Sequence, residues 1–159
     1  MALLVSISAV YEQLIEVLPT IEVTKLAATL LDAIPKDLPV LLVQAKLSCI
    51  KNLITSKLFQ DDESRNILLA TACKHLRTQL HRRDELKLCT DILGEILSFL
   101  FKQRKQFDGQ GKINNCMHHD VETLCINVLD ILVQAVLSII DRDTKILVSF
   151  DLVLKAKTK

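Results

Sequence analysis

Apolar residues recur at helical spacing along almost the whole chain, and only short polar or proline-containing segments interrupt them. Leu, Ile, Val and Ala supply most of this pattern, while the 159 residues include only three Gly and three Pro. Straight-chain apolar residues lose little rotamer freedom in a helix, whereas Gly and Pro favour turns. No segment alternates apolar and polar residues between turn residues, as a strand would. The sequence therefore predicts an all-α protein.

The interruptions predict about seven helices, each with a recognisable start or stop signal. The predicted helices cover about residues 2–18, 20–34, 38–56, 61–80, 84–105, 120–140 and 143–159. Thr20, Asp37, Asp61 and Asp84 are placed to cap helix starts, because their side chains can accept hydrogen bonds from free backbone N–H groups. Gly94 interrupts the fifth helix and costs roughly 1 kcal/mol relative to Ala, which predicts a close helix crossing there.

Short turns between long helices make successive helices antiparallel neighbours. Two folds fit this arrangement: a closed helical bundle, or helix pairs stacked as an armadillo/HEAT-like solenoid segment. A period of roughly 40 residues per helix pair favours the stack. We expect residues 1–159 to form a single helical-repeat segment of a larger protein, because the chain begins and ends inside helical patterns. Residues 106–119 are polar and hold two of the three Gly, which predicts an internal flexible loop.

Helical spacing also predicts which side chains are buried. In the second, fourth and fifth predicted helices the expected core residues are Ile21, Leu26, Leu30 and Ile34, then Ile67, Leu69, Ala72, Cys73, Leu76 and Leu80, then Leu86, Cys89, Leu93, Ile96, Leu97 and Leu100. The sixth helix is apolar on nearly every face, which is typical of a helix flanked on several sides by others.

Charge and cysteine content limit which classes of partner and which cellular compartment are expected. The net charge is +1, and acidic and basic residues are mixed along the chain, which argues against a nucleic-acid partner. The longest apolar stretch, residues 121–140, contains Glu122, Asn127, Asp130 and Gln134, which would be costly in lipid, so we expect a buried helix and no membrane insertion. Five Cys, an odd number in apolar surroundings, indicate a reducing, cytoplasmic compartment.

Residues 112–125, with the sequence KINNCMHHDVETLC, hold the candidate metal ligands. Cys116 with His118 or His119 could form one zinc-binding pair, but a second pair is hard to find. If a helix begins at Asp120, that residue caps it and Cys125 falls on a core face beside Leu124. The sequence contains no GxxxxGK[ST], GxGxxG or GxSxG motif. We therefore predict no catalytic, cofactor-binding or metal site, and the metal-dependent protein stays a minor alternative.

Four segments resemble the central helical-repeat region of the DOCK (dedicator of cytokinesis) family. They read LLDAIPKDL, SKLFQDDESRNILL, HRRDELKLCTDILGEILSFL and IDRDTKILVSF, and the resemblance covers about residues 30–150. The residues that carry it are mostly core or helix-boundary positions: Leu58, Phe59, Arg65, Ile67, Leu68, Leu69, Glu85, Leu86, Cys89, Ile96, Leu97, Arg142, Asp143 and Phe150.

The resemblance implies a parent that is a large cytoplasmic guanine-nucleotide exchange factor for Rac and Cdc42. In that family a phospholipid-binding domain precedes the helical region and a catalytic exchange domain follows it, so no exchange residue is carried over to this chain. The implied partners are proteins: neighbouring domains, adaptor proteins and, indirectly, Rho-family GTPases. The implied role is a non-catalytic scaffold. The alternative is a self-contained armadillo/HEAT-type adaptor unrelated to nucleotide exchange.

Overall fold

The computed structural model describes residues 2–35, 39–107, 115–134 and 137. Six α-helices, one 3₁₀ turn and one π turn make up the described elements. They are α1 (Ala2–Leu14), α2 (Thr20–Ala33), α3 (Val40–Thr55), η1 (Lys57–Gln60, 3₁₀), α4 (Asp62–Arg82), α5 (Leu86–Phe107), α6 (Asn115–Leu124) and η2 (Cys125–Leu129, π). The all-α prediction is confirmed. The seventh predicted helix, residues 143–159, lies outside the described residues.

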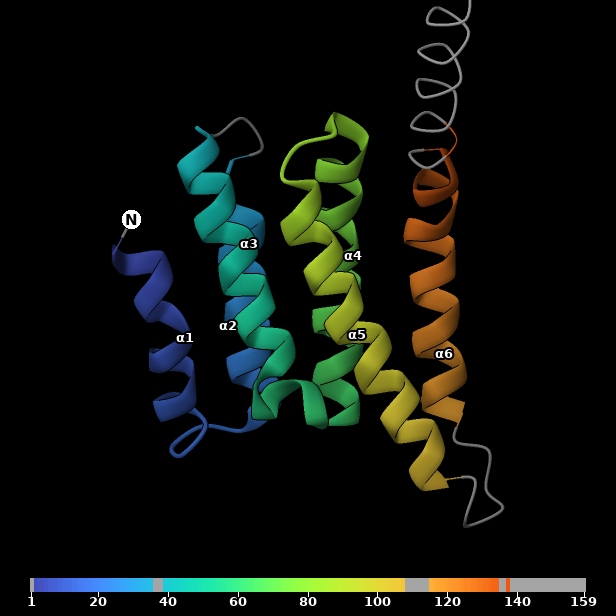
Figure 1. The fold of residues 1–159 in the computed structure, drawn as a ribbon. Coiled ribbons are helices and arrows are strands. Elements are labelled where there is room, and N and C mark those ends of the chain that lie inside the picture. Colours follow the sequence, from blue (N-terminus) through green and yellow to red (C-terminus); the bar gives the residue numbers. More distant parts are fainter. Residues whose placement is uncertain (1, 36–38, 108–114, 135–136, 138–159) are drawn as a thin grey trace, which may run out of the picture.

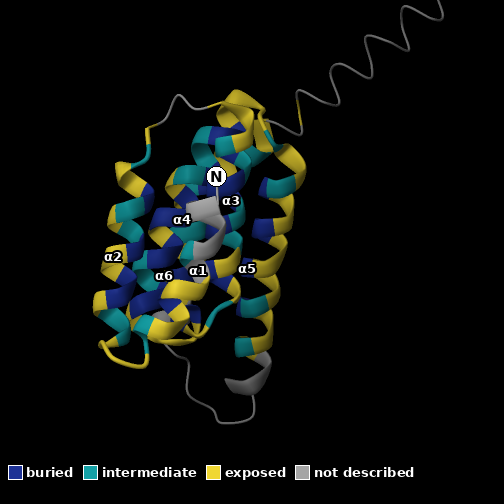
Figure 2. Cartoon of the chain, turned by 90° about the vertical axis from the view of Figure 1, so that its left-hand side faces the viewer, coloured by how far each residue is buried: buried dark blue, intermediate teal, exposed yellow. Residues whose placement is uncertain are grey.

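The helices form two layers in which each successive helix runs antiparallel to the one before it (Figure 1). One layer holds α1, α3 and α5, with α1 packed on α3 and α3 on α5. The other holds α2, α4 and α6, with α2 packed on α4 and α4 on α6. Figure 2 views the stack along its length, with α5 and α2 on opposite sides. Helix pairs stacked side by side confirm the predicted helical-repeat architecture.

Several helix boundaries follow from short-range chemistry. The predicted cap at Asp61 is confirmed, because its carboxylate accepts a hydrogen bond from Ser64 N at 3.0 Å. The predicted cap at Thr20 is wrong, since Thr20 is the first residue of α2 and Pro19 occupies the N-cap position. Asp84 lies one residue too early to cap α5, which begins at Leu86. The predicted cap Asp37 lies outside the described residues.

The turn between α4 and α5 contains two non-glycine residues in the left-handed region. Arg83 has φ 58° and Glu85 has φ 49°. Arg83 ends α4, and its N–H donates to the carbonyls of Gln79 and Leu80. Glu85 accepts a hydrogen bond from Gln44 Nε2 of α3 at 2.9 Å. Each left-handed residue costs on the order of 1 kcal/mol, and these backbone and side-chain contacts help to hold the turn in place.

One hydrophobic core runs through the stack from α1 to the residues just after η2. Its first and last members along the chain are Tyr11 and Ile131, and the largest fully buried side chain is Phe59. The centre lies on α4, which packs against α2, α3, α5, α6 and η1. Five of the six core residues predicted for α4 are buried: Leu69, Ala72, Cys73, Leu76 and Leu80. The sixth, Ile67, is half-buried.

Three of the predicted core leucines are exposed instead. On α2, Leu26 faces solvent because Val23, Ala27 and Leu31 face the neighbouring helices. On α5, Leu86 and Leu97 are exposed, although Cys89, Ile96 and Leu100 are buried as predicted. The apolar residues of α5 occupy a wider arc of the helix than its described neighbours bury. Helical spacing alone could therefore not predict which edge of that arc is exposed.

The boundaries of the predicted 106–119 loop differ from those observed. Residues 106–107 belong to α5 and residues 115–119 to α6, and residues 108–114 lie outside the described part. Helix α6 starts at Asn115 rather than Asp120, because residues 115–119 contain no Gly or Pro to stop it. Asp120 is therefore not an N-cap; its carboxylate contacts Arg65 instead.

The prediction of a close helix crossing at Gly94 is wrong for the described residues. Gly94 is exposed, and a Cβ atom placed on it would meet nothing within 4 Å. The prediction that the sixth helix is covered on several sides is also wrong for its described residues. Val121, Ile126, Leu129 and Val133 are exposed, because α6 lies at the end of the stack (Figure 1).

Candidate interaction surface

A buried arginine joins α4 to α6, the last helix that the structure describes. The Arg65 guanidinium of α4 donates from Nε to Asp120 Oδ2 of α6 at 2.7 Å. The two side chains are 5% and 1% exposed, so this ion pair is almost free of solvent. A second donor, Nη2, contacts Asp62 Oδ1 at 2.6 Å, and that carboxylate is half-exposed. Burial lowers the pKa of Arg65, but the hydrogen bonds to the Asp120 and Asp62 carboxylates outweigh it, so the pKa lies above its usual value.

The same guanidinium also contacts η1 and α5. Its Nη1 lies 3.5 Å from the carbonyl oxygens of Phe59 and Gln60. Its Cζ atom lies 5.4 Å from the centre of the Phe99 ring of α5, within the range of a cation–π contact. The Phe99 ring in turn meets Phe59 edge-on, with centroids 5.0 Å apart. One side chain thus fixes α4, η1, α5 and α6 relative to one another.

The sequence identifies Arg65 only through the family resemblance, and it predicts Asp120 only as a helix cap. A signal was present in the spacing, because Arg65 lies three and four residues before Leu68 and Leu69, which are buried. A charged residue on the core side of a helix needs a buried partner. That partner, Asp120, is 55 positions away in the sequence, so local spacing could not identify it.

A second arginine, Arg77, joins α4 to the π turn η2. Its two terminal nitrogens bind both carboxylate oxygens of Asp130, at 2.8 and 2.9 Å. Nη1 also donates to the carbonyl oxygen of Asn127, within η2, at 2.8 Å. These hydrogen bonds are the main reason that the pKa of Asp130 is lowered and that of Arg77 is raised. Both side chains are about half-exposed, so the pair fixes geometry more than it adds stability.

A small cavity lies between α3, α4 and Pro35, which follows α2. Its volume is about 20 Å³, enough for one water or two, and its polar lining includes Lys46, His75 and Gln79. Asp32 of α2 contacts Lys74 Nζ at 2.9 Å and lies 3.2 Å from His75 Nε2. Burial, followed by the Lys46 ammonium, lowers the pKa of His75 to about 4. The cavity is too small for a substrate, and we assign it a structural role.

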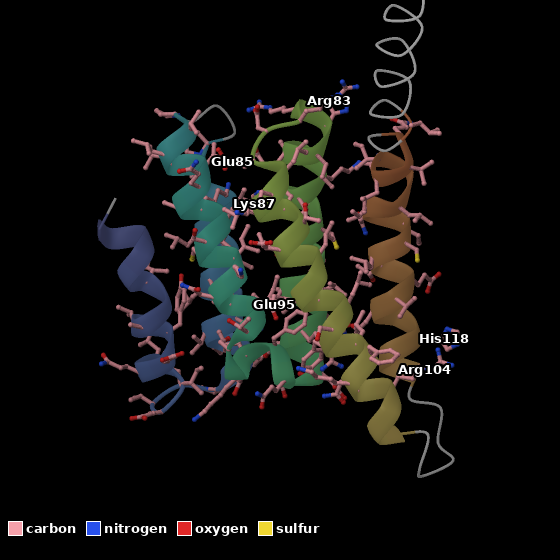
Figure 3. The ribbon with its side chains drawn as sticks, viewed as in Figure 1. Arg83, Glu85, Lys87, Glu95, Arg104 and His118 are labelled. Atoms are coloured by element: carbon pink, nitrogen blue, oxygen red, sulfur yellow. The ribbon has the colours of Figure 1, made fainter. Side chains whose placement is uncertain are left out.

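The sequence singled out four Cys and His residues as possible metal ligands. His118, His119 and Cys125 are exposed on α6 and η2, and the side chain of Cys116 is not described. The expectation that Cys125 is buried is wrong, because the core side of this segment carries Val128 instead. Figure 3 shows His118 at the same end of the molecule as Arg104 of α5. Among the described residues, no three His, Cys, Asp or Glu side chains gather as a metal site would require.

Among the described residues, most of the exposed large apolar side chains lie on α5, on α6 and on the residues from η2 onward. Eight large apolar residues of α5, α6, η2 and the helical residues after η2 are between 37% and 69% exposed: Leu86, Leu97, Phe101, Val121, Ile126, Leu129, Val133 and Leu137. Exposed apolar residues in this number make this part of the molecule a candidate for contact with another apolar surface. We call these eight residues the α5–α6 end face. In the described part of the chain, no helix is both long and apolar enough to span a membrane.

Helix pairs stacked around one continuous core define a helical-repeat architecture. The sequence model of the "Dedicator of cytokinesis (DOCK) TPR region" matches residues 1–156. The chain therefore belongs to the DOCK family and corresponds to its TPR region. The family prediction made from the sequence is confirmed.

The relatives show how small a part of a DOCK protein this region is. Dedicator of cytokinesis protein 3 from Mus musculus and from Homo sapiens is 28% identical over 143 residues, which is 89% of this chain and 7% of each relative. Dedicator of cytokinesis protein 4 from Homo sapiens is 28% identical over 139 residues, 86% of this chain and 7% of that protein. The chain thus spans less than a tenth of their length. No solved structure matches it significantly.

Proposed function

We propose that this chain is a non-catalytic scaffold segment of a DOCK-type guanine-nucleotide exchange factor for Rac or Cdc42. It would hold neighbouring domains of the parent protein in a fixed relation and offer a surface to other proteins in the cytoplasm. Three findings support this proposal: the match to the family's TPR region, the 7% span of the relatives, and the all-helical repeat architecture. The exchange activity itself would belong to another part of the parent.

The observation that carries the proposal is the single core combined with the Arg65 ion pairs. A scaffold can hold the domains at its two ends in a fixed relation only if its repeats do not bend freely against one another. Here α1 and the residues just after η2 share one core, and the buried Arg65–Asp120 pair fixes the last helix to the centre. Because a buried charge is costly to separate from its partner, α6 is held in one orientation.

Nucleotide release from the GTPases tests the non-catalytic part of this proposal. Purified chain, at concentrations up to tens of micromolar, is added to Rac or Cdc42 loaded with a fluorescent GDP analogue. We expect release at the intrinsic rate of each GTPase, and EDTA, which removes Mg²⁺, serves as the positive control. A concentration-dependent acceleration would show that the chain has exchange activity, and the proposal would then be wrong.

A further inference from the structure

On α5, exposed apolar side chains of the end face lie next to the side of the helix that its neighbours bury. Its buried side chains, among them Ile92 and Ile96, face α3, α4 and α6. Next to them Leu86, Thr90 and Leu97 lie on one side of the helix, because they are four and then seven residues apart. The Thr90 hydroxyl donates to the carbonyl oxygen of Leu86, so this polar group is already satisfied. This edge of α5 is therefore suited to contact with another apolar surface.

Four end-face residues from α6, η2 and the helical residues after η2 form a stripe that follows the helix axis. Val121, Leu129, Val133 and Leu137 are exposed and separated by multiples of four residues. In a regular α-helix such a stripe drifts around the axis, since one turn holds 3.6 residues. The π turn η2 lies in the middle of the stripe and accommodates roughly one extra residue. The drift is thereby reduced, and the stripe stays on one side of α6.

The topology of the stack shows where a further helix would lie. Odd-numbered helices form one layer and even-numbered helices the other, and each odd helix after the first packs on the odd helix before it (Figure 1). The next position in the odd layer is beside α5 and against α6. Both α5 and α6 carry residues of the end face, and the open space around Gly94 shows that no described residue fills the place beside it.

We propose that residues 144–154, TKILVSFDLVL, dock on the α5–α6 end face as the next helix of the odd layer. This segment follows the polar break at residues 141–143, which allows the chain to reverse direction. Val148 and Leu152 fall on one side of a helix, whereas the segment's other apolar residues, Ile146, Leu147, Phe150, Val153 and Leu154, are spaced by one, three, three and one. That spacing gives one apolar side to a helix, which matches a shallow face made of two helices.

The chain's own segment is favoured over a second copy of the protein by its tether. Twenty-two residues follow Leu137, the last described position, and the segment begins seven residues beyond it. A short connection gives an effective concentration in the millimolar range, well above that of a second molecule in dilute solution. A helix of eleven residues is about 16 Å long, which is enough to cover three turns of α5 or α6. This inference concerns the fold of the chain and does not depend on the proposed role in GTPase signalling.

Site-specific photocrosslinking tests the inference on the full 159-residue chain. The variant Leu97→p-benzoylphenylalanine carries its photoreactive group on the end face, and irradiation is done at low micromolar concentration with an equal amount of ¹⁵N-labelled chain. We expect cross-links from position 97 to residues 144–154 of the same molecule. Cross-links between labelled and unlabelled molecules would show that a second copy occupies the face. Cross-links to no part of residues 144–154 would also overturn the inference.

Hydrogen exchange provides a second measurement that does not require a cross-link. We expect the amides of residues 146–154 to exchange at least tenfold more slowly than in an unfolded peptide. The double variant Leu129→Asp with Val133→Asp should abolish that protection, because it places two charges on the face. The matched control is Leu26→Asp, which puts a charge at an exposed leucine on α2 and should leave the protection unchanged. Unprotected amides in the wild-type chain, or equal loss in the control, would contradict docking.

Discussion

Removal of the Asp120 carboxylate is the perturbation that most directly tests the buried ion pair. In Asp120→Ala, the Arg65 guanidinium loses its 2.7 Å partner while its side chain stays 95% buried. Loss of one partner of a buried pair costs about 3–5 kcal/mol. Arg65 retains Asp62 and two distant carbonyl oxygens, so we expect a loss near the lower end, about 3 kcal/mol. This is a large fraction of the total stability of a domain of this size.

The assay is urea unfolding at neutral pH, followed by circular dichroism at 222 nm. Asp62→Ala is the matched control, because it removes the other carboxylate of the same arginine, but one that is 51% exposed. We expect this control to cost less than about 1 kcal/mol, as exposed pairs do. The double variant Arg65→Met with Asp120→Leu should be more stable than Asp120→Ala, since no charge is left buried. If Asp120→Ala costs no more than Asp62→Ala, the argument for a buried, structure-determining pair is wrong.

Three further predictions concern the core, His75 beside the small cavity, and the cysteines. Leu76→Ala, at a fully buried site on α4, should cost about 2–5 kcal/mol in urea unfolding, whereas Leu26→Ala on the exposed side of α2 should change stability by less than about 0.5 kcal/mol. NMR titration should give a pKa close to 4 for His75. Because His75 in the unfolded chain binds its proton near pH 6.5, the free energy of unfolding should fall by up to about 3 kcal/mol as the pH is lowered from 6.5 to 4. The variant His75→Leu should lose this dependence; an unchanged pH profile would refute it. In a Cys116→Ser background, Cys125 should react with a thiol reagent within minutes, while Cys49, Cys73 and Cys89 should react only on unfolding, because they are buried and burial raises their pKa values to about 11 or 12. Fast reaction of more than one thiol in the folded protein would contradict the burial described.

The helical architecture could be predicted because its signals are local. Apolar spacing and breaks at Pro19, residues 35–39 and Asp61 specify where helices form, and each depends on residues a few positions apart. The cap at Asp61 is of this kind. Which helices stack is less local, but short turns leave few alternatives.

The interaction surface could be predicted only in part, because its properties depend on distant residues. Asp is a residue type that often caps helices, so the sequence predicts a cap at Asp120. Only the fold shows that Arg65, 55 residues earlier, contacts its carboxylate. Leu97 and Cys125 carry apolar side chains at core spacing, yet they are exposed because they lie at the end of the stack. Hydrophobic spacing identifies an apolar helix surface that burial would stabilise, but it does not show whether a neighbouring helix buries it.

The rigidity of the stack from α1 to α6 is the central claim, and single-molecule energy transfer across it is the most direct test. Donor and acceptor dyes are attached at Gln13→Cys of α1 and Gln134→Cys after η2, both exposed positions, in a background with Cys116→Ser and Cys125→Ser. We predict one narrow transfer distribution that does not change between 50 mM and 500 mM salt, because the Arg65–Asp120 pair is buried and poorly screened. The same distribution should broaden in Asp120→Ala. A broad or multiple distribution in the unperturbed chain would contradict a rigid scaffold.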